Sequence, residues 1–573
     1  NQSLAVQFLS QYEQGCQANN GYTALMFALA NKHFDLCGLL QQEISITSNN
    51  KTTALMVGAA SGLKSVGPLG QLAKRFNQQN LSAIMIAAIQ DNSALFDALF
   101  PAEGLLKSQN GVTSLMVAAA CGRLHLVKFI KQRYQQLLKL QDSEGKTALR
   151  YAFDQLESSG DQQENFVEII YELVEEEGEL TANDQKTTLM LAAQNNVVDI
   201  AETFLEAQKK MQDEAGMTAL MYAAKAGAAE LINLLKPEEQ RYKDQQGRCA
   251  LLHAAAGSQF DAFNQLVEEE FELLDNDERH VMHYAARAGC SDIVQVIQET
   301  FETQADANGV TTLMVAAEHN APACFEFLQK EKAMSDAAGN TVLHYAAMGD
   351  CPEGCRQFSG LKSRNNDGYA PIDIALDKDA GRAFIVLAGQ QKQITFLDAV
   401  LGNKSRICKA VADVARTSRF QGAEFTPKEQ QFCRKVLSEG KDGEKCIFAA
   451  LEAGCWETAR VLAPVFAKEF SKEGMSPLMF LITRGFQGQQ EDFGRFLKAG
   501  EVLVKHCAGM QMPRGSQMGA TALMLGMANF KVGQTEDLLR QLIQVEGEVV
   551  DFAGENYLKY AEAAEVLEEV QQW

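Results

Sequence analysis

The stretch TSLMVAAACGRLHLVKFI, residues 113–130, opens with a threonine, continues through a short apolar run and reverses at a glycine. TTLMLAAQNN at 187–196 and TALMYAAKAG at 218–227 repeat the same phrase. Taking the first residue of each copy as an anchor gives Thr23, Thr53, Ser82, Thr113, Thr147, Thr187, Thr218, Cys249, His280, Thr311, Thr341, Ala370, Lys445, Ser476 and Thr521. From Thr187 to Thr311 every step is 31 residues. A period of this length predicts a solenoid of stacked repeats.

Each position of the phrase has a physical role. The residue two after the anchor is apolar in every copy, as at Leu25 and Leu115, and is predicted to point inward from a first helix. The residue five after the anchor is Ala or Gly in all copies except the one with Leu481, which lets neighbouring helices approach closely. Nine after the anchor, most copies have Gly, Asn or Asp, residues that tolerate the left-handed conformation that ends a helix.

A second amphipathic segment follows each phrase, for example SDIVQVIQET at 291–300, and a polar turn such as DANGVT at 306–311 precedes the next anchor. Asp, Asn and Gly favour such turns, and the anchor threonine can cap the helix that it begins. One repeat is therefore a turn, a short helix, a tight reversal and a longer helix. Because neither helix can bury its apolar face alone, the expected fold is an all-α solenoid of stacked helix-turn-helix repeats joined by β-turn fingers.

The repeat resembles the ankyrin repeat, whose usual phrase is G-x-T-P-L-H-x-A-A-x-x-G. Here G-x-T-A-L-M-x-A-A replaces it, and His283 and His344 keep the family's histidine. The resemblance covers about residues 15–390 and 440–550 and implies an ankyrin-repeat solenoid. The TALM phrase is similar to the large ankyrin families of diplomonad flagellates, in which many members are cytoskeletal scaffolds and some carry an upstream kinase-like domain.

Breaks in the spacing predict the domain organisation. Residues 1–392 are expected to form an ankyrin block of about twelve repeats after a partial one, and residues 393–444 a degenerate or irregular helical segment. Residues 445–550 are expected to form a second block with insertions, and residues 551–573 a C-terminal helical cap. The polar stretch ESSGDQQEN at 157–165 is expected to lie between the two helices of one repeat.

The composition narrows the possible partners. The chain has 573 residues with 52 Lys+Arg against 74 Asp+Glu, a formal charge of −22 that repels nucleic-acid phosphates and anionic lipid surfaces. No apolar run approaches the roughly 20 residues that span a bilayer. The 13 cysteines are scattered singly, which is typical of reduced core thiols in a cytoplasmic protein. We therefore expect a cytoplasmic protein, with cytoskeletal association implied by the resemblance, and neither nucleic-acid binding nor membrane insertion.

Residue types that carry catalysis or bind metal are explained by the repeat. His280 and His283 are three residues apart, but one is an anchor and the other is the family histidine. Cys351 and Cys355 lack the second pair of ligands that a zinc site needs. No G-x-S-x-G, H-E-x-x-H or protein-kinase phrase occurs. The sequence thus predicts no enzymatic activity, cofactor, metal or small-molecule substrate.

Two surfaces are candidates for binding a partner. The residue four after each anchor lies off the most buried stripe of the first helix, and the alternative for this column is packing between repeats. Four tyrosines of the column are candidate contacts, and so are three exposed finger tips. These residues are Tyr151, Tyr222, Tyr284, Tyr345, Gln245, Asn308 and Ala338. The acidic runs ELVEEEGEL at 172–180 and LVEEEFELL at 266–274 are expected to form a solvated outer face, or alternatively a patch for a basic partner.

The sequence therefore predicts a non-enzymatic scaffold for protein–protein interaction, with basic or cytoskeletal proteins as the expected partners. The alternative is a regulatory or targeting ankyrin region of a larger protein, such as a kinase or pseudokinase, whose catalytic part would precede Asn1. The absence of an initiating methionine favours that alternative.

Overall fold

A computed structural model describes residues 15–156, 158, 160–298, 305–359, 364–390, 396–438, 440–441, 444–466, 469–471, 475–484, 493–507, 511, 521–522 and 542. The chain divides into two compact units, Asn1–Asn276 and Asp277–Trp573, which are described separately. Over the described ranges both units consist of short helices. The strands are two residues long and pair into two-stranded hairpins. The predicted all-α architecture is confirmed.

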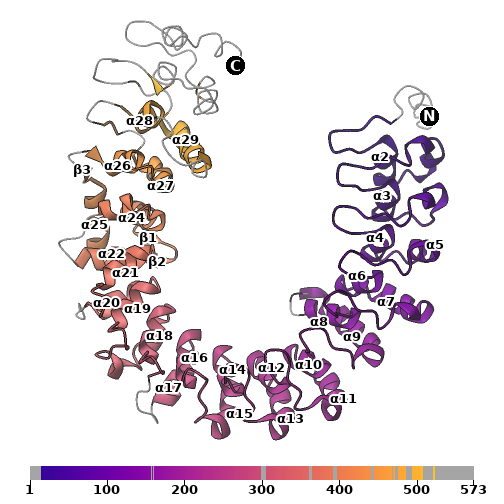
Figure 1. Cartoon of the computed structure of the whole chain (residues 1–573), viewed down its shortest axis with the longest axis horizontal. Coiled ribbons are helices and arrows are strands. Elements are labelled where there is room, and N and C mark those ends of the chain that lie inside the picture. Colours follow the sequence, from indigo (N-terminus) through magenta and orange to yellow (C-terminus); the bar gives the residue numbers. More distant parts are fainter. Residues whose placement is uncertain are drawn as a thin grey trace. The chain divides into compact units, whose positions relative to one another are not determined.

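In the N-terminal unit each first helix begins one residue after an anchor. These helices are α2 (Ala24–Ala30), α3 (Ala54–Ala60), α4 (Ala83–Ile89), α6 (Ser114–Ala120), α8 (Ala148–Leu156), α10 (Thr188–Gln194), α12 (Ala219–Ala226) and α14 (Ala250–Ala256). The elements that follow them are η1 (Phe34–Gly38), η2 (Gln41–Glu43), η3 (Gly67–Leu72), α5 (Ser93–Glu103), α7 (Leu124–Arg133), η4 (Gln135–Leu137), η5 (Gly160–Gln162), α9 (Gln163–Glu177), α11 (Val198–Gln208), α13 (Ala229–Glu239) and α15 (Phe260–Glu270). The fingers project on one side of α2, α3 and α4, and α5 lies on the other side of α4 (Figure 1).

The three roles assigned to the phrase are confirmed by the backbone and by burial. Thr187 Oγ1 accepts a hydrogen bond from Met190 N at 3.3 Å and so caps α10. Nine residues after the anchors the backbone is left-handed, with φ of +55° at Asn196 and +75° at Gly227. Ala223, five after its anchor, is fully buried. Local chemistry therefore determines where each first helix begins and ends.

The core lies between a layer of first helices and a layer of second helices. First helices pack against first helices, as α12 does against α10 and α14, and second helices against second helices, as α13 does against α11 and α15. Leu220, Leu231 and Leu235 are fully buried where α12 meets α13. Burying each leucine contributes about 1.5–3 kcal/mol. Because every repeat buries this surface against its neighbours, stacking is what stabilises the short helices.

The second element is not a long α-helix in every repeat, contrary to the prediction. After α3 the chain winds as the 3₁₀ helix η3. Pro68 has no backbone N–H, Gly67 has a φ of +45°, and both residues weaken an α-helix. Leu69 and Leu72 still fill the core at 1% and 2% exposure. The shorter element therefore preserves the packing while it loses the helical hydrogen-bond ladder.

A buried carboxylate joins successive repeats. Glu239, the last residue of α13, is 1% exposed, and its Oε2 accepts a hydrogen bond from Leu220 N at 2.8 Å. Its Oε1 accepts from Lys210 N at 2.9 Å, in the loop that ends the preceding repeat. We call this arrangement the glutamate clamp. Buried glutamates accept the corresponding pair of backbone bonds in other repeats, namely Glu43, Glu103, Glu177 and Glu270, and Glu331 accepts the bond from Leu313 N.

Two clamp residues fall in the acidic runs that were predicted to be solvated. Glu177 and Glu270 are fully buried, whereas the side chains of Glu176 and Glu269 are 39% and 35% exposed. The prediction was therefore wrong for one glutamate of each run. Helical rotation turns that residue inward, and two backbone N–H groups offset the cost of burying its carboxylate.

Over its described residues, the C-terminal unit continues the repeats and interrupts them between α22 and α26. Its repeat helices are α16 (Val281–Ala288), α17 (Ser291–Gln298), α18 (Thr312–Glu318), η6 (Pro322–Cys324), η7 (Gln329–Glu331), α19 (Val342–Met348), α20 (Pro352–Gln357), α21 (Pro371–Asp377), α22 (Gly381–Gln390), α26 (Cys446–Glu452), α27 (Trp456–Phe466), α28 (Pro477–Arg484) and α29 (Phe493–Cys507). The interruption holds α23 (Phe396–Leu401), α24 (Ser405–Thr417), β1 (Arg419–Phe420), β2 (Ala423–Glu424), α25 (Pro427–Ser438), β3 (Gly440–Lys441) and β4 (Glu444–Lys445).

Within the interruption α24 packs against α22, α25 and α27, so it belongs to the same core as the repeats. Strand β1 pairs antiparallel with β2, and β3 pairs with β4. Arg356 of α20 attaches α25 to the repeats because its Nε donates to Glu429 Oε1 at 3.0 Å. The domain boundaries inferred from the sequence stay predictions, and the predicted cap at 551–573 lies outside the described residues.

Candidate functional site

Each finger is closed by a side chain that accepts backbone hydrogen bonds, an aspartate in several repeats and Ser or Asn in others, such as Ser48 and Asn77. Asp213 Oδ1 accepts hydrogen bonds from Ala215 N and Met217 N, each at 2.9 Å, which closes the turn before α12. Asp142, Asp244 and Asp306 accept the equivalent pairs of backbone bonds in their fingers. These carboxylates are therefore occupied by the backbone of their own fingers.

In several fingers the second oxygen of the aspartate binds a side chain of the first helix that follows. Tyr222 Oη donates to Asp213 Oδ2 at 2.6 Å, and Tyr151 and Tyr345 donate to their own finger aspartates at 2.8 Å. Burial, followed by the hydrogen bond to Asp213, raises the pKa of Tyr222 well above its usual range. The neutral hydroxyl therefore fixes the finger against its helix.

The four tyrosines predicted as partner contacts consequently lie between repeats. Tyr222, Tyr284 and Tyr345 are 7%, 9% and 9% exposed, and Tyr151 is half-buried. This burial corresponds to the alternative of packing between repeats and corrects the expectation of exposed anchors. Helical rotation alone would leave this column exposed, but the finger that carries the aspartate covers it. Their role in binding a partner stays a prediction.

The three finger tips are exposed as expected, but they also join neighbouring fingers. Gln245 N donates to Ala215 O at 3.0 Å, and its Nε2 donates to Glu214 O at 2.7 Å. Asn308 O and Ala338 O each accept a backbone N–H of the next finger at 2.9 Å. The fingers thus form a ladder of hydrogen bonds. Gln245 has a structural role that the sequence did not indicate.

Apart from Ala24 and Phe27 of α2, the exposed side chains of the described first helices lie seven and eight residues after the anchors. In the described repeats before α17 they include Lys225, Ala226, Ala256, Arg287 and Ala288. The sequence analysis missed these columns, although a signal was present. The positions two and five after the anchor keep one residue type from copy to copy, whereas the position seven after it changes between Lys, Ala, Arg and Glu. Variation in one column beside constant columns indicates that the varying residues are exposed to solvent.

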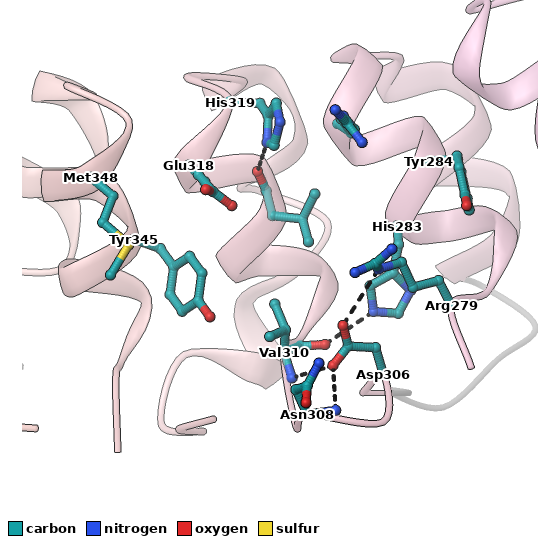
Figure 2. Close-up of a pocket in the computed structure, with 12 residues that line it drawn as sticks. Arg279, His283, Tyr284, Asp306, Asn308, Val310, Glu318, His319, Tyr345 and Met348 are labelled. Carbon is teal, nitrogen blue, oxygen red and sulfur yellow. Dashed lines mark hydrogen bonds and ion pairs between the residues drawn. The ribbon is translucent and has the colours of Figure 1, made fainter. Parts of the chain in front are cut away.

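A pocket of about 370 Å³ opens on this face of the C-terminal unit, over α16, α18 and α19 and the finger before α18 (Figure 2). Val310, Val315, Tyr345 and Met348 supply its apolar part. Arg279, Arg287, Glu318 and His319 supply its charged and polar rim. The pocket is large enough for one or two side chains of a docked protein segment, and its rim carries both signs of charge.

Fixed contacts hold one side of this pocket. Arg279 Nη1 lies 2.7 Å from Asp277 Oδ2, and its Nε lies 3.5 Å from Asp306 Oδ2. His283 Nε2 lies 3.1 Å from Val310 O, and burial lowers the pKa of this imidazole, which favours its neutral form. Arg287 and Glu318, in contrast, are exposed on the rim. A partner therefore meets one side of the pocket that is held by these contacts, and an exposed cation and an exposed anion on its rim.

The comparison with protein families identifies the repeat. A sequence model of ankyrin repeats, three copies long, matches residues 161–245 and 227–303. Residues 161–303 contain ankyrin repeats. The fold described above is accordingly an all-α ankyrin-repeat solenoid. The comparison with curated proteins gave no match.

Ankyrin repeats are a module for protein–protein interaction and are not catalytic. Within the described ranges, no three His, Cys, Asp or Glu side chains gather so as to hold a metal ion. None of the helices described combines the length and the apolar character that crossing a membrane requires. The ankyrin face of first helices and fingers is thus the candidate site, and its chemistry is recognition.

Proposed function

We propose that this chain is a scaffold that binds other proteins along the face formed by its fingers and first helices. The observation that supports this most directly is the pocket over α16, α18 and α19, which combines an apolar floor with an exposed arginine and an exposed glutamate. Such a site fits a segment that inserts an apolar side chain between two charged groups.

Charge favours a basic partner at the fingers. Exposed acids occupy the finger tips, among them Glu144, Glu214, Asp277 and Glu278. The outer face is less available, because lysines of one second helix pair with glutamates of the next. Lys128 Nζ lies 2.9 Å from Glu168 Oε2, and Lys236 Nζ lies 2.8 Å from Glu269 Oε2. A basic protein therefore meets exposed carboxylates at the fingers, of which Glu144 and Asp277 also form ion pairs with Lys146 and Arg279.

We further propose that the scaffold acts in the cytoplasm and that cytoskeletal proteins are among its partners. The resemblance of the TALM phrase to cytoskeletal ankyrin families and the scattered single cysteines support this assignment. Fluorescence microscopy of the tagged full chain tests it. Enrichment on filaments is the expected result, and confinement to the nucleus or to a membrane compartment would contradict it.

The binding face is tested by exchanging the rim charges of the pocket. The double variant Arg287→Glu, Glu318→Arg keeps the net charge of the chain. Glu326→Arg, Lys330→Glu is its control, at two exposed residues of which Glu326 lies between η6 and η7 and Lys330 lies in η7. Affinity purification from the source cells with quantitative mass spectrometry should show specific partners that the rim variant loses and the control keeps. If both variants retain every partner that the unmodified chain recovers, the interface lies elsewhere.

A further inference from the structure

The candidate face changes its chemistry along the N-terminal unit. One residue before the anchor the first four repeats have Tyr22, Thr52, Leu81 and Val112, whereas later repeats have Lys146, Lys186, Arg248 and Arg279. Seven after the anchor the first four have Ala30, Ala60, Ile89 and Ala120, whereas later ones include Asp154, Lys225, Arg287 and Glu318. Both columns are therefore uncharged in the first four repeats, whereas in the eleven later copies five residues of the first column and six of the second are charged.

The fingers change at the same place. The four-residue tips at 18–21, 48–51, 77–80 and 108–111 read ANNG, SNNK, NQQN and SQNG, and Lys51 is their single charged residue. The tips at 142–145 and 213–216 read DSEG and DEAG. In a chain of net charge −22, four successive repeats without an acid at the finger tip or in either column are a distinct surface.

This surface is accessible as well as uncharged. Phe27 is 45% exposed, Ala30 and Ala60 are exposed, and Ile89 and Ala120 are half-buried. All of them belong to α2, α3, α4 and α6, which pack in sequence. The alanines keep the helix face low, so that a partner backbone can approach closely. We call the face formed by these five residues with Tyr22, Leu81 and Val112 the uncharged strip.

We propose that the uncharged strip docks a segment of a partner protein whose contacting side chains are aliphatic and carry no charge, a proposal that rests on the scaffold function above. A charged segment would lose its hydration there without gaining an ion pair, which disfavours it. The four helices span three interaxial steps of about 8–10 Å, or roughly 30 Å. That length corresponds to about 20 residues of a helical partner at about 1.5 Å per residue.

One chain would then carry two docking surfaces of different chemistry. Residues 22–120 select an uncharged aliphatic segment, and the repeats from Lys146 onward select a charged one. Binding at the uncharged strip is expected to be nearly independent of salt, whereas binding at the later repeats weakens as salt rises. The scaffold can thus hold two kinds of partner without competition between them.

The test selects peptides without assuming their sequence. A displayed library of random 20-residue peptides is selected on the purified full chain, and the enriched peptides are resynthesised for fluorescence binding measurements. They are measured against the triple variants Ala30→Glu, Ala60→Glu, Ala120→Glu and Ala30→Lys, Ala60→Lys, Ala120→Lys. The same two sets of substitutions at the exposed Ala226, Ala256 and Ala288 are the controls. Circular dichroism and melting curves of every variant verify the fold.

We expect a class of peptides that both strip variants weaken at least tenfold and that both controls bind within twofold. These peptides should be aliphatic and uncharged, and their Kd should change less than twofold between 50 and 500 mM salt. Opposite effects of the Glu and Lys variants would show a charged partner and overturn the proposal, as would a selection in which no peptide depends on the strip. A selection that enriches no peptide at all would count against the scaffold function itself.

Discussion

The glutamate clamp predicts a large energetic difference between two adjacent glutamates of α13. Glu239 accepts two hydrogen bonds from buried or half-buried backbone N–H groups and is 1% exposed. Glu238 has a side chain 32% exposed and forms ion pairs with Lys209 and Lys210. The same substitution, Glu to Gln, can therefore be made at two neighbouring positions with different consequences.

At position 239 the amide oxygen of Gln can replace only one acceptor, and the amide nitrogen then faces the second N–H donor. One backbone donor is left unsatisfied, at a cost of about 1–3 kcal/mol. Glu239→Leu removes both acceptors and should cost roughly twice as much, about 2–6 kcal/mol. Glu238→Gln removes solvent-screened ion pairs, which contribute little, and should leave stability nearly unchanged.

Hydrogen–deuterium exchange with mass spectrometry is the suitable assay, because it measures local opening in the full chain. Stability in a solenoid is distributed among repeats, so a single unfolding midpoint would average the effect. Peptides covering α12, α13 and the loop at Lys210 should lose protection in Glu239→Gln and keep it in Glu238→Gln. Equal protection in the two variants would refute the clamp.

Three further predictions concern other contacts of the repeats. Ala223→Leu should lower stability by about 1–3 kcal/mol through overpacking between α12 and its neighbours, which a lower melting temperature would report. Tyr222→Phe removes the bond to Asp213 and should cost about 0.5–1.5 kcal/mol in denaturant unfolding. Burial opposes ionisation of Asp244, but bonds from His253 and Arg248 lower its pKa to about 2. The stability that its carboxylate adds is therefore complete above the ordinary value of 3.8 and lost as the pH falls toward 2, and Asp244→Asn should abolish this acid-dependent step in unfolding curves.

The first helices could be predicted from the sequence because each of their boundaries depends on local chemistry. An anchor such as Thr187 caps a backbone N–H three residues away, and Gly227 ends its helix through its own φ. The second elements were predicted less well, because a segment such as 67–72 combines apolar spacing with Gly and Pro, and spacing alone does not report the competing backbone preference.

The candidate site was predicted only in outline. The finger tips are exposed, but Tyr222, Tyr284 and Tyr345 are buried and Tyr151 is half-buried. At Tyr222 the finger folds back and brings the aspartate nine residues earlier onto the hydroxyl. Helical periodicity predicts which face of a helix a residue occupies, but it cannot predict a contact that depends on the path of a loop. The exposed columns seven and eight after the anchor could have been found by comparing the copies with each other, since those columns vary where the core columns do not.

The clamp shows most clearly what sequence patterns leave out. Glu175, Glu176 and Glu177 have the same chemistry, and only Glu177 is fully buried, because its Oε1 and Oε2 accept bonds from Lys139 N at 3.0 Å and Leu149 N at 2.8 Å. One of these donors belongs to the loop of the preceding repeat, so the burial of Glu177 follows from stacking and not from its own helix. The interpretation of the run as a solvated face treats each helix as isolated.

In the next repeat Gln208 takes the position of the clamp glutamate. Its Nε2 donates to Gly178 O at 2.9 Å, at the place where the clamp glutamates accept an N–H. Where the preceding loop presents a carbonyl, an amide can satisfy it and a carboxylate cannot, so Gln208→Glu should destabilise the junction between α9 and α11 in the same exchange assay that tests Glu239→Gln. Unchanged protection at that junction would show that the choice between Glu and Gln at this position does not depend on whether the preceding loop presents an N–H or a carbonyl.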